Sequence, residues 1–508
     1  MNMPQPYATL PNQGTLPLKE LPVLSYSEFF QTVSHLLGLE GHHCVACYGH
    51  RTLENIQIIC CIADDLHHTI KVFSCLAEGN RLVRLASLAK THFPMHLFER
   101  EIAENFGIEF MYHPWPKPVR YAWNRADKTQ VINNYPFYRI DGNELHEVGV
   151  GPIHAGVIEP GHFRFLCNGE TVLHLEIQLG WQHRGVEALF LEMPSLLQRT
   201  ILSESIAGDT AVGHSLAFVN LMESLGNITV PEELELERTM ALELERIAMH
   251  LGDLGNVNIG MAYQLASSVF GTLRTPLINY TQTWCGNRFG KGLNRVGGTH
   301  YPFNEELAKK LVTLLDKVEE SFSPMSERLF SLPSFLMRAE TIGRVTEKQM
   351  RLIGAVGMTA RAAGIPSDIR QSHPFAAYKR YEIDHQTLEQ GDVWARMMLR
   401  SLEVKDSIRF VRELAQRSGP ATNPSSPIKE MDLKLMPDTF CISLVEGWRG
   451  EICHCAITND RGELAHYKIK DPSFHNWMAL ALSLRDLEIS DFPINNKSYN
   501  LSYCGFDL

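Results

Sequence analysis

The sequence predicts an α+β fold, in which a small N-terminal α+β domain precedes a large, mainly α-helical domain with peripheral antiparallel β-hairpins. Strand-like runs of alternating apolar residues fill much of residues 44–75. From about residue 186 to residue 417 the apolar residues recur with the period of a helix instead. A chain of 508 residues is also longer than one core usually supports, so two or more domains are expected.

The first predicted domain covers residues 25–140 and follows a polar, proline-bearing arm at residues 1–24. Its expected elements are a helix at 26–37, strands at 44–51, 56–63 and 69–75, and helices at 84–93 and 97–106. Residues 112–145 are rich in Pro, Trp, Asn and Tyr, which is typical of an extended connector.

The second predicted domain covers residues 141–508. A hairpin is expected at 162–179, because Asn168-Gly169 is a strong turn signal. The clearest helix is 231–251, with Pro231 in its first turn and Gly252 just past its end. The remaining expected elements are a helix at 305–321 with Asn304 as N-cap, a helix at 388–416, a loop at 418–436 and a β-hairpin at 440–469 that turns at 459–462.

Composition and charge argue against several classes of protein. The net charge of -11, from 47 basic and 58 acidic residues, argues against nucleic acid as a partner. The N-terminus has neither the basic start nor the apolar core of a signal peptide, and no apolar run approaches the roughly 20 residues of a membrane span. The 11 cysteines are therefore read as free thiols of a reducing compartment.

Three segments place polar groups in apolar surroundings. They are residues 151–164, which contain Glu159, residues 183–187, which begin with His183 and Arg184, and residues 361–375, which contain Asp368 and Arg370. Taken singly, each segment is as easily a strand end or a turn that satisfies its own backbone. Their occurrence together and in this order favours a shared site.

These segments and several others form an ordered series of short motifs. Gly151-Pro-x-His, Glu159-Pro-Gly-His-Phe-Arg, His183-Arg-Gly-x-Glu, Glu243-x-Glu-Arg-Ile-x-x-His, Asp368-x-Arg-x-x-x-Pro, Glu446-Gly-Trp-Arg-Gly-Glu and Lys468-Ile-Lys-Asp-Pro-Ser-Phe stand in the chain in that order. Across residues 148–508 the chain resembles the large subunit of energy-converting [NiFe] hydrogenases and, more distantly, the large quinone-module subunit of respiratory complex I. Residues 98–108, with Glu104 in an acidic position, resemble the small hydrophilic subunit of complex I. The fusion of both subunits is a hydrogenlyase-type arrangement.

The four positions where the hydrogenase pattern has metal-binding cysteines hold Ala207, Thr210, Ser502 and Gly505. Nickel in such a site needs soft thiolates, whereas Ala and Gly offer no donor and neutral hydroxyls are weak ligands. Cys504, next to the last position, is a lone thiol. The resemblance therefore predicts the scaffold without a nickel centre, so the chain is not expected to be a nickel-dependent hydrogenase.

The resemblance also implies roles for single residues. Glu159 matches a proton relay, although it could equally cap the turn before Pro160. Arg246 and His250 share one face of a helix with Glu243, by their spacing. In complex I the matching histidine lies beside an iron–sulfur cluster of the neighbouring subunit, whereas the alternative is a charged stripe on a surface or subunit-interface helix.

The remaining matched pair is Asp368 and Arg370. By analogy they flank the former metal cavity, where they either shape a pocket or polar route or form a plain ion pair. His183 and Arg184 complete the set of candidate catalytic residues.

The resulting hypothesis is a peripheral-arm oxidoreductase subunit of a membrane-bound, complex I-like assembly. It would pass electrons from a partner's iron–sulfur cluster to an acceptor, a quinone or a sulfur compound, in the former Ni–Fe cavity, coupled to ion (proton) translocation. The alternative is a non-catalytic subunit for docking and proton coupling. Expected partners are an iron–sulfur small subunit, a ferredoxin-like subunit and antiporter-type membrane subunits, which would hold the chain at the cytoplasmic face of the inner membrane.

No cofactor is expected on the chain itself, apart from a possible quinone. No Gly-x-Gly-x-x-Gly sequence follows a predicted strand, so NAD binding enters only as a property of the complex I family.

Overall fold

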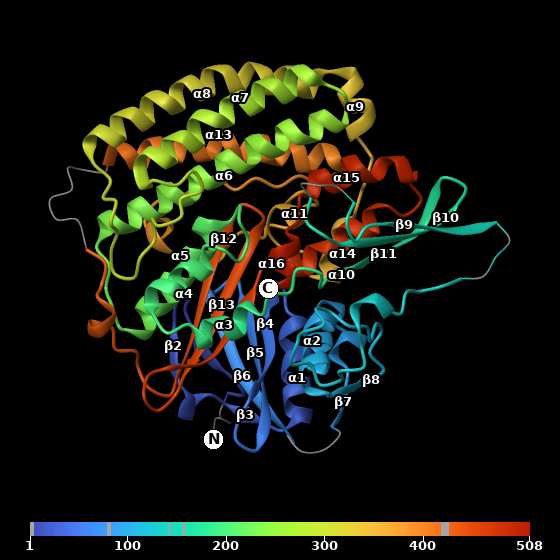
Figure 1. The fold of residues 1–508 in the computed structure, drawn as a ribbon, viewed down its shortest axis with the longest axis vertical. Helices are drawn as coiled ribbons and strands as arrows, with labels where there is room; N and C mark the ends of the chain where they lie inside the picture. Colours follow the sequence, from blue (N-terminus) through green and yellow to red (C-terminus); the bar gives the residue numbers. More distant parts are fainter. Residues whose placement is uncertain (1–4, 79–82, 141, 143, 155–157, 418–425) are drawn as a thin grey trace.

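The computed structural model describes residues 5–508 except 79–82, 141, 143, 155–157 and 418–425. The expected start of the arm, the 140/141 boundary and the first half of the 418–436 loop therefore lie partly outside the described residues. Figure 1 shows a layer of long helices above a central sheet, with the N-terminal sheet below and a three-stranded hairpin sheet projecting to one side. The C-terminus lies in the middle of the molecule.

The N-terminal unit is built on one antiparallel meander. Strands β4 (His42–Arg51), β5 (Asn55–Asp64) and β6 (Thr69–Glu78) pair in sequence, and helices α1 (Tyr26–Leu37) and α2 (His96–Phe106) pack on this sheet. Ser25 and Glu28 form a capping box that fixes the start of α1. Gly107, in the left-handed region at φ 73°, ends α2. The predicted helices at 26–37 and 97–106 and the three predicted strands are confirmed.

The N-terminal arm is a structural tie between two sheets. Strands β1 (Ala8–Leu10) and β3 (Val23–Leu24) both pair with β6, whereas β2 (Thr15–Pro17) pairs with β12 (Thr439–Gly447) near the other end of the chain. One buried core accordingly runs from β4–β6 into the helices of the large domain.

Four long helices form the upper layer of the large domain. They are α6 (Glu232–Gly260), α7 (Gln264–Cys285), α8 (Glu305–Ser331) and α13 (Val393–Arg417). Helix α6 packs against α7 and α13, and α8 packs against the same two helices. Asn304 caps α8 by accepting a hydrogen bond from the Leu307 amide, as predicted.

Shorter helices connect this layer to the sheets. They are α3 (Val186–Glu192), α4 (Leu196–Ser203), α5 (Ala211–Leu225), α9 (Pro333–Ala339), α10 (Glu347–Ile353), α11 (Gly357–Arg361), α12 (Ile369–Ser372), α14 (Ser473–Ser483), α15 (Phe492–Tyr499) and α16 (Tyr503–Asp507). In the described part of the chain, no helix has the length and apolar character needed to cross a membrane.

Two antiparallel sheets belong to the large domain. The central sheet has the order β14 (Leu464–Lys470), β13 (Gly450–Thr458), β12 and β2. The projecting sheet consists of β9 (Leu145–Val150), β10 (His162–Asn168) and β11 (Thr171–Gln178). The predicted β10–β11 hairpin is confirmed, and its turn residues are Gly169 and Glu170, directly after Asn168. Cys453 and Cys455 lie in the core with their sulfurs 3.8 Å apart, which agrees with core packing on one strand face.

Several predicted boundaries are wrong. Residues 84–93 form the short strand β7 (Arg84–Ala86), which pairs with β8 (Glu109–Met111), and a 3-10 turn instead of a helix. The helix predicted at 305–321 continues to Ser331. The segment 440–469 contains three strands, because a tight turn at Trp448-Arg449 divides the first part into β12 and β13.

Gly252 shows why the predicted end of the 231–251 helix was also wrong. It lies inside α6, where a Cβ would stand 3.2 Å from Nε of Arg274 on α7. The Arg274 Nε in turn donates to the carbonyl of Ala248. The glycine therefore permits a close helix contact, and it does not terminate the helix.

Candidate functional site

The four substituted positions lie together in the interior. Ala207, Thr210, Ser502 and Gly505 are all buried. Thr210 is the N-cap residue of α5 and Ser502 is the N-cap residue of α16. The Ser502 hydroxyl oxygen accepts a hydrogen bond from the Gly505 amide at 2.9 Å, so it satisfies the start of α16.

The space next to Gly505 is filled by a carboxylate. A Cβ at position 505 would stand 2.6 Å from both Cγ and Oδ2 of Asp471 and 2.9 Å from Oγ of Ser502. Asp471 is buried, and its Oδ2 accepts from Nε2 of His214 at 3.1 Å. The residues present therefore do not fit a nickel–iron pair, because two positions carry no donor and a hard carboxylate occupies the place of a thiolate.

Behind Asp471 lies a line of buried polar side chains. Nδ1 of His214 is 3.1 Å from Nε2 of His454, and Nδ1 of His454 is 2.8 Å from the hydroxyl of Tyr467. Burial, followed by His214, holds the pKa of His454 well below its ordinary value. Burial raises the pKa of Asp471, but the hydrogen bond and charge of His214 outweigh this, and the pKa lies below its usual range.

Arg449 holds the other side of the site. Its guanidinium donates to both carboxylate oxygens of Asp209 at 2.7 Å, to the Thr210 hydroxyl at 3.2 Å, and to the carbonyl of Asn500. This arginine thereby joins the loop that contains two of the substituted positions to the C-terminal segment that contains the other two. A bidentate pair of this kind fixes geometry as well as charge.

The predicted residues Glu159, His183 and Arg184 converge on the same C-terminal segment. Glu159 is half-buried, and its Oε2 accepts from the Cys504 amide at 3.4 Å. His183 donates from Nδ1 to the carbonyl of Asp507 at 2.8 Å. The exposed Arg184 donates to the carbonyls of Ile206 and Cys504 at 2.8 and 3.2 Å, so it bridges both halves of the site at its surface edge.

The C-terminal segment itself carries two perturbed groups. Burial raises the pKa of Asp507 to about 7, against the opposing hydrogen bonds from the amides of Gln182 and Gly180. Burial, reinforced by Glu159, raises the pKa of the Cys504 thiol to about 12. The thiol is therefore protonated at neutral pH and is a poor nucleophile and metal ligand in this state.

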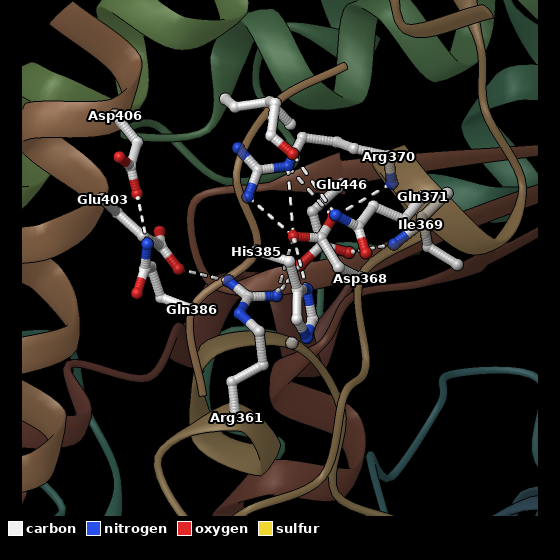
Figure 2. Close-up of polar contacts among 12 residues, drawn as sticks. Arg361, Asp368, Ile369, Arg370, Gln371, His385, Gln386, Glu403, Asp406 and Glu446 are labelled. Atoms are coloured by element: carbon white, nitrogen blue, oxygen red, sulfur yellow. Dashed lines mark hydrogen bonds and ion pairs between the residues drawn. The ribbon is translucent and has the colours of Figure 1, made fainter. Parts of the chain in front are cut away.

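The other predicted residues form a second cluster, the arginine–carboxylate network. It comprises Arg246, Arg361, Arg370, Glu243, Asp368, Glu403 and Glu446, with His250 at one end. Figure 2 shows Arg361 between Glu403 and Asp368, with Arg370 and Glu446 close by. All of these side chains are buried.

His250 lies inside this network. Its Nε2 donates to Oε2 of Glu403 at 2.7 Å, and Glu403 also forms an ion pair with Arg361. Burial lowers the pKa of His250 to about 4, against the opposing effect of Glu403. The expected surface or interface stripe on α6 is wrong for this chain, because Glu243, Arg246 and His250 are all fully buried.

Asp368 and Arg370 form a close pair, with Nη2 of Arg370 2.6 Å from Oδ2 of Asp368. Arg370 also reaches Glu243 at 3.1 Å. Burial alone would raise the pKa of Asp368, but Arg370 and Arg361 outweigh it and hold the pKa below its usual range. The pair is thus part of a network and is not an isolated ion pair.

The turn between β12 and β13 connects the two clusters. Arg246 donates to the carbonyls of Glu446 and Gly447 at 2.8 and 3.3 Å. One residue further on, the Trp448 indole donates to the carbonyl of Asp209 at 2.8 Å. The predicted site residues are therefore two adjoining groups, one around the C-terminal segment and one around His250.

Several residues of the site escaped sequence reasoning. Glu446 and Arg449 were quoted within a matched motif without a role of their own, and so was Asp471 within Lys-Asp-Pro-Ser-Phe. Glu403 could have been suspected because Arg396, Arg400 and Glu403 recur at helical spacing within an otherwise core-facing helix, where unpaired charges are rare.

One cavity lies apart from the substituted positions. It measures about 440 Å³ and lies between the N-terminal sheet and β14, lined among others by Tyr48, His50, Arg120, His183 and His466. None of the four substituted positions lines it.

One protein family and several known proteins are similar to this chain in sequence. The family described as the 49 kDa subunit of respiratory-chain NADH dehydrogenase matches residues 265–507. Hydrogenase-4 component G of Escherichia coli is 28% identical over 382 residues, which cover 75% of this chain and 65% of that protein, just under two thirds of its length. Formate hydrogenlyase subunit 5 of Escherichia coli is 27% identical over 415 residues, covering 78% and 72%.

A solved structure extends the comparison to the fold. One chain of the membrane-bound sulfane sulfur reductase, an archaeal respiratory membrane complex, superimposes with a TM-score of 0.66 at 19% identity, covering 73% of this chain and all of that one. This likeness concerns the fold alone. The ordered motifs and the matched relatives make the chain similar to the large subunits of membrane-bound hydrogenases and of respiratory complex I.

Proposed function

We propose that the chain is a peripheral-arm subunit of a membrane-bound, complex I-like assembly, in which electrons from a partner's iron–sulfur cluster reach an acceptor beside the C-terminal segment. The relatives named above are parts of hydrogenase-4 and formate hydrogenlyase, and the matched family is a subunit of NADH dehydrogenase, which supports this role. The observation that carries the proposal is the intact arrangement of Glu159, His183 and Arg184 around a metal position that is itself filled.

The acceptor meets the chain at the surface edge of this arrangement. Because Asp471 and Ser502 occupy the former metal position, the acceptor is expected against the exposed Arg184 and the half-buried Glu159, where a partner subunit completes the site. Arg184 offers a guanidinium to a quinone carbonyl or a polysulfide anion, and Glu159 is placed to supply a proton. The structural neighbour's name gives support to a sulfur compound as one of the two acceptor classes.

The test uses the purified complex with a reduced donor, and quinone and polysulfide as alternative acceptors. Glu159→Gln is expected to slow acceptor reduction by about 10²-fold, the scale of general acid catalysis, while electron entry into the complex is unchanged. Glu147→Gln, at an exposed carboxylate on β9 outside the site, is the control. If neither acceptor is reduced by the wild-type complex, the redox role is wrong.

A second function, docking and proton coupling without chemistry on this chain, is favoured by the arginine–carboxylate network. That network connects His250 to the 361–370 segment without any group that an acceptor can reach. In this case Glu159→Gln leaves acceptor reduction unaltered, whereas Glu403→Gln uncouples ion transport from electron flow.

A further inference from the structure

A line of alternating charges crosses from the N-terminal sheet to the central sheet. Nδ1 of His43 on β4 lies 3.3 Å from Oδ2 of Asp65, the residue after β5, and its Nε2 lies 2.6 Å from Oε2 of Glu451 on β13. The other carboxylate oxygen of Glu451 pairs with Nζ of Lys470 on β14. The order Asp65, His43, Glu451, Lys470 thus alternates acid and base between two sheets that are far apart in the sequence.

The position between two carboxylates favours a charged ring at His43. A neutral imidazole has one N–H donor and one bare nitrogen, so one of its two nitrogens would turn a lone pair toward a carboxylate oxygen. The imidazolium instead directs an N–H toward Asp65 and another toward Glu451. Burial alone would lower the pKa of His43, but Asp65 and Glu451 outweigh burial and hold that pKa well above its ordinary value.

Glu451 lies in the interior between two cations. Its side chain is 1% exposed, as is that of Lys470, whereas the side chain of His43 is 27% exposed. A buried carboxylate is stable only when its charge is paired and hydrogen-bonded. Lys470 contacts one oxygen and His43 the other, so loss of the His43 charge leaves a buried carboxylate oxygen without its partner.

Two further histidines approach this line at its ends. Nδ1 of His373, in the segment after α12, lies 3.4 Å from Oδ1 of Asp65, and burial lowers the pKa of this ring against the charge of Asp65. At the inner end, burial, followed by Lys470, holds the pKa of His475 on α14 well below its ordinary value. Among the described residues, Glu451 therefore has its counter-charges from His43 and Lys470.

The strands that carry the inner pair also carry two residues of the candidate site. Glu451 is the second residue after Arg449, and Lys470 directly precedes Asp471. Arg449 joins the two halves of the site, and Asp471 fills the space beside Gly505. Neighbouring residues of a strand share one backbone, so a displacement of Glu451 or Lys470 also displaces a residue of the site.

We propose that the His43 imidazolium is a positioning residue for the candidate site and acts across the contact between the N-terminal sheet and the central sheet. It holds Glu451, and with it Lys470, so that Arg449 and Asp471 keep their places. The histidine touches no acceptor and transfers no proton. Its effect on acceptor reduction rests on the proposed function, whereas its effect on the geometry of the site does not.

The experiment measures the charge of His43 and the geometry of the site separately, in the full-length chain without donor or acceptor. Nitrogen-15 NMR of histidine-labelled protein at neutral pH is expected to show both ring nitrogens of His43 protonated, and His43→Gln assigns that signal by removing it. The reporter of the site is His214, whose Nε2 lies 3.1 Å from Oδ2 of Asp471. His43→Gln is expected to shift the His214 signal. His67→Gln, at an exposed histidine in the turn that carries Asp65, is the matched control and should leave the signal in place.

A charged replacement separates the charge of His43 from its shape. His43→Arg keeps a cation with several N–H donors, so it is expected to return the His214 signal close to its wild-type position. The equilibrium constant of unfolding is expected to rise about tenfold or more in His43→Gln and less in His43→Arg, because a buried carboxylate loses its partner only in the first.

Three results would overturn the proposal: a neutral His43 ring, a His214 signal in His43→Gln that matches the wild type, or equal shifts of that signal in His43→Gln and His43→Arg. Because no acceptor is involved, these results are independent of whether the complex reduces quinone or polysulfide. A complex that reduces neither acceptor would remove the proposed function and leave the positioning of the site unaffected.

Discussion

At the scale of single residues, the substituted metal position is a packed structure. Ser502 caps α16, Asp471 binds His214, and Arg449 binds Asp209 and Thr210. Each polar group has therefore acquired a structural partner within the chain. Thr210 and Ser502 stand at the starts of two helices, and the carboxylate of Asp471 packs against Gly505.

Gly505→Ala tests how tightly this position is packed. The added Cβ would lie 2.6 Å from Asp471, so we expect the free energy of unfolding to fall by about 1–3 kcal/mol, the usual cost of overpacking. The better helix propensity of Ala alone would raise the free energy of unfolding by about 1 kcal/mol. A fall in the free energy of unfolding would therefore indicate overpacking. Urea denaturation provides the measurement, with Gly208→Ala as control, where a Cβ meets nothing within 4 Å. Equal stability of both variants would contradict the packing.

At the scale of elements, the N-terminal arm extends the central sheet beyond its own strands. The side chain of Asn12 donates to the carbonyls of His373 and Leu444 at 2.8 and 3.0 Å and accepts from the Leu444 amide at 2.8 Å. The amide group thus pairs with β12 as a further strand residue would. It joins the arm both to the central sheet and to the segment after α12.

Asn12→Ala is expected to lower the free energy of unfolding by about 2–4 kcal/mol, from three lost hydrogen bonds at about 1 kcal/mol each. Thermal or urea denaturation measures this loss. Gln13→Ala, which removes an exposed hydrogen bond to Lys379, is the matched control and should cost under about 0.5 kcal/mol. A loss no larger than that of the control would show that the arm adds little to the sheet.

Element existence was predictable from the sequence, and element ends were less so. The helix at 26–37 was predicted from its apolar pattern and the β10–β11 hairpin from Asn168-Gly169, since both are local signals. Gly252 misled because its role depends on Arg274, a contact that no local pattern reveals. The Trp448-Arg449 turn was missed because Gly450, which ends it, is required by a close approach to Gly357, and no local pattern reveals that contact.

The residues of the candidate site also differ in how well the sequence predicts them. Glu159, His183 and Arg184 could be predicted to lie close together because all three belong to motifs matched to one family. The burial of Glu243, Arg246 and His250 could not, because charged residues on a helical face read as a solvated stripe until Glu403 and Arg370 supply their partners from distant segments. Asp471 was missed because a filled cavity leaves no signature in the sequence.

At the scale of the whole molecule, the buried titratable groups predict an optimum of stability in mildly acidic solution. Burial raises the pKa values of five carboxyls to about 7 or about 8: Glu99, Glu237, Glu245, Glu446 and Asp507. A raised carboxyl binds its proton more tightly in the folded state. Its contribution to stability is complete below the unfolded pKa and is lost as pH rises through about 7–8.

Buried neutral histidines act in the opposite direction. Burial lowers the pKa of His250 and His113 to about 4, so their contribution is present above the unfolded pKa of about 6.5 and is lost as pH falls. We therefore expect the melting temperature to peak between about pH 5 and 6.5. Glu245→Gln should flatten the fall toward pH 8, whereas Glu305→Gln, at an exposed helix start, should not. A melting temperature that still rises from pH 6.5 to 8 would contradict this balance.

The arm also has a consequence for the order of events during synthesis. Strands β1 and β3 can pair with β6 as soon as the first domain has been made, but Thr15 must wait for Cys441, almost the whole length of the chain later. In any folding intermediate in which β2 has not yet paired, β12 is an open edge of the central sheet, and open edges recruit foreign strands. The pairing of one of the first segments with one of the last therefore also protects the sheet against aggregation.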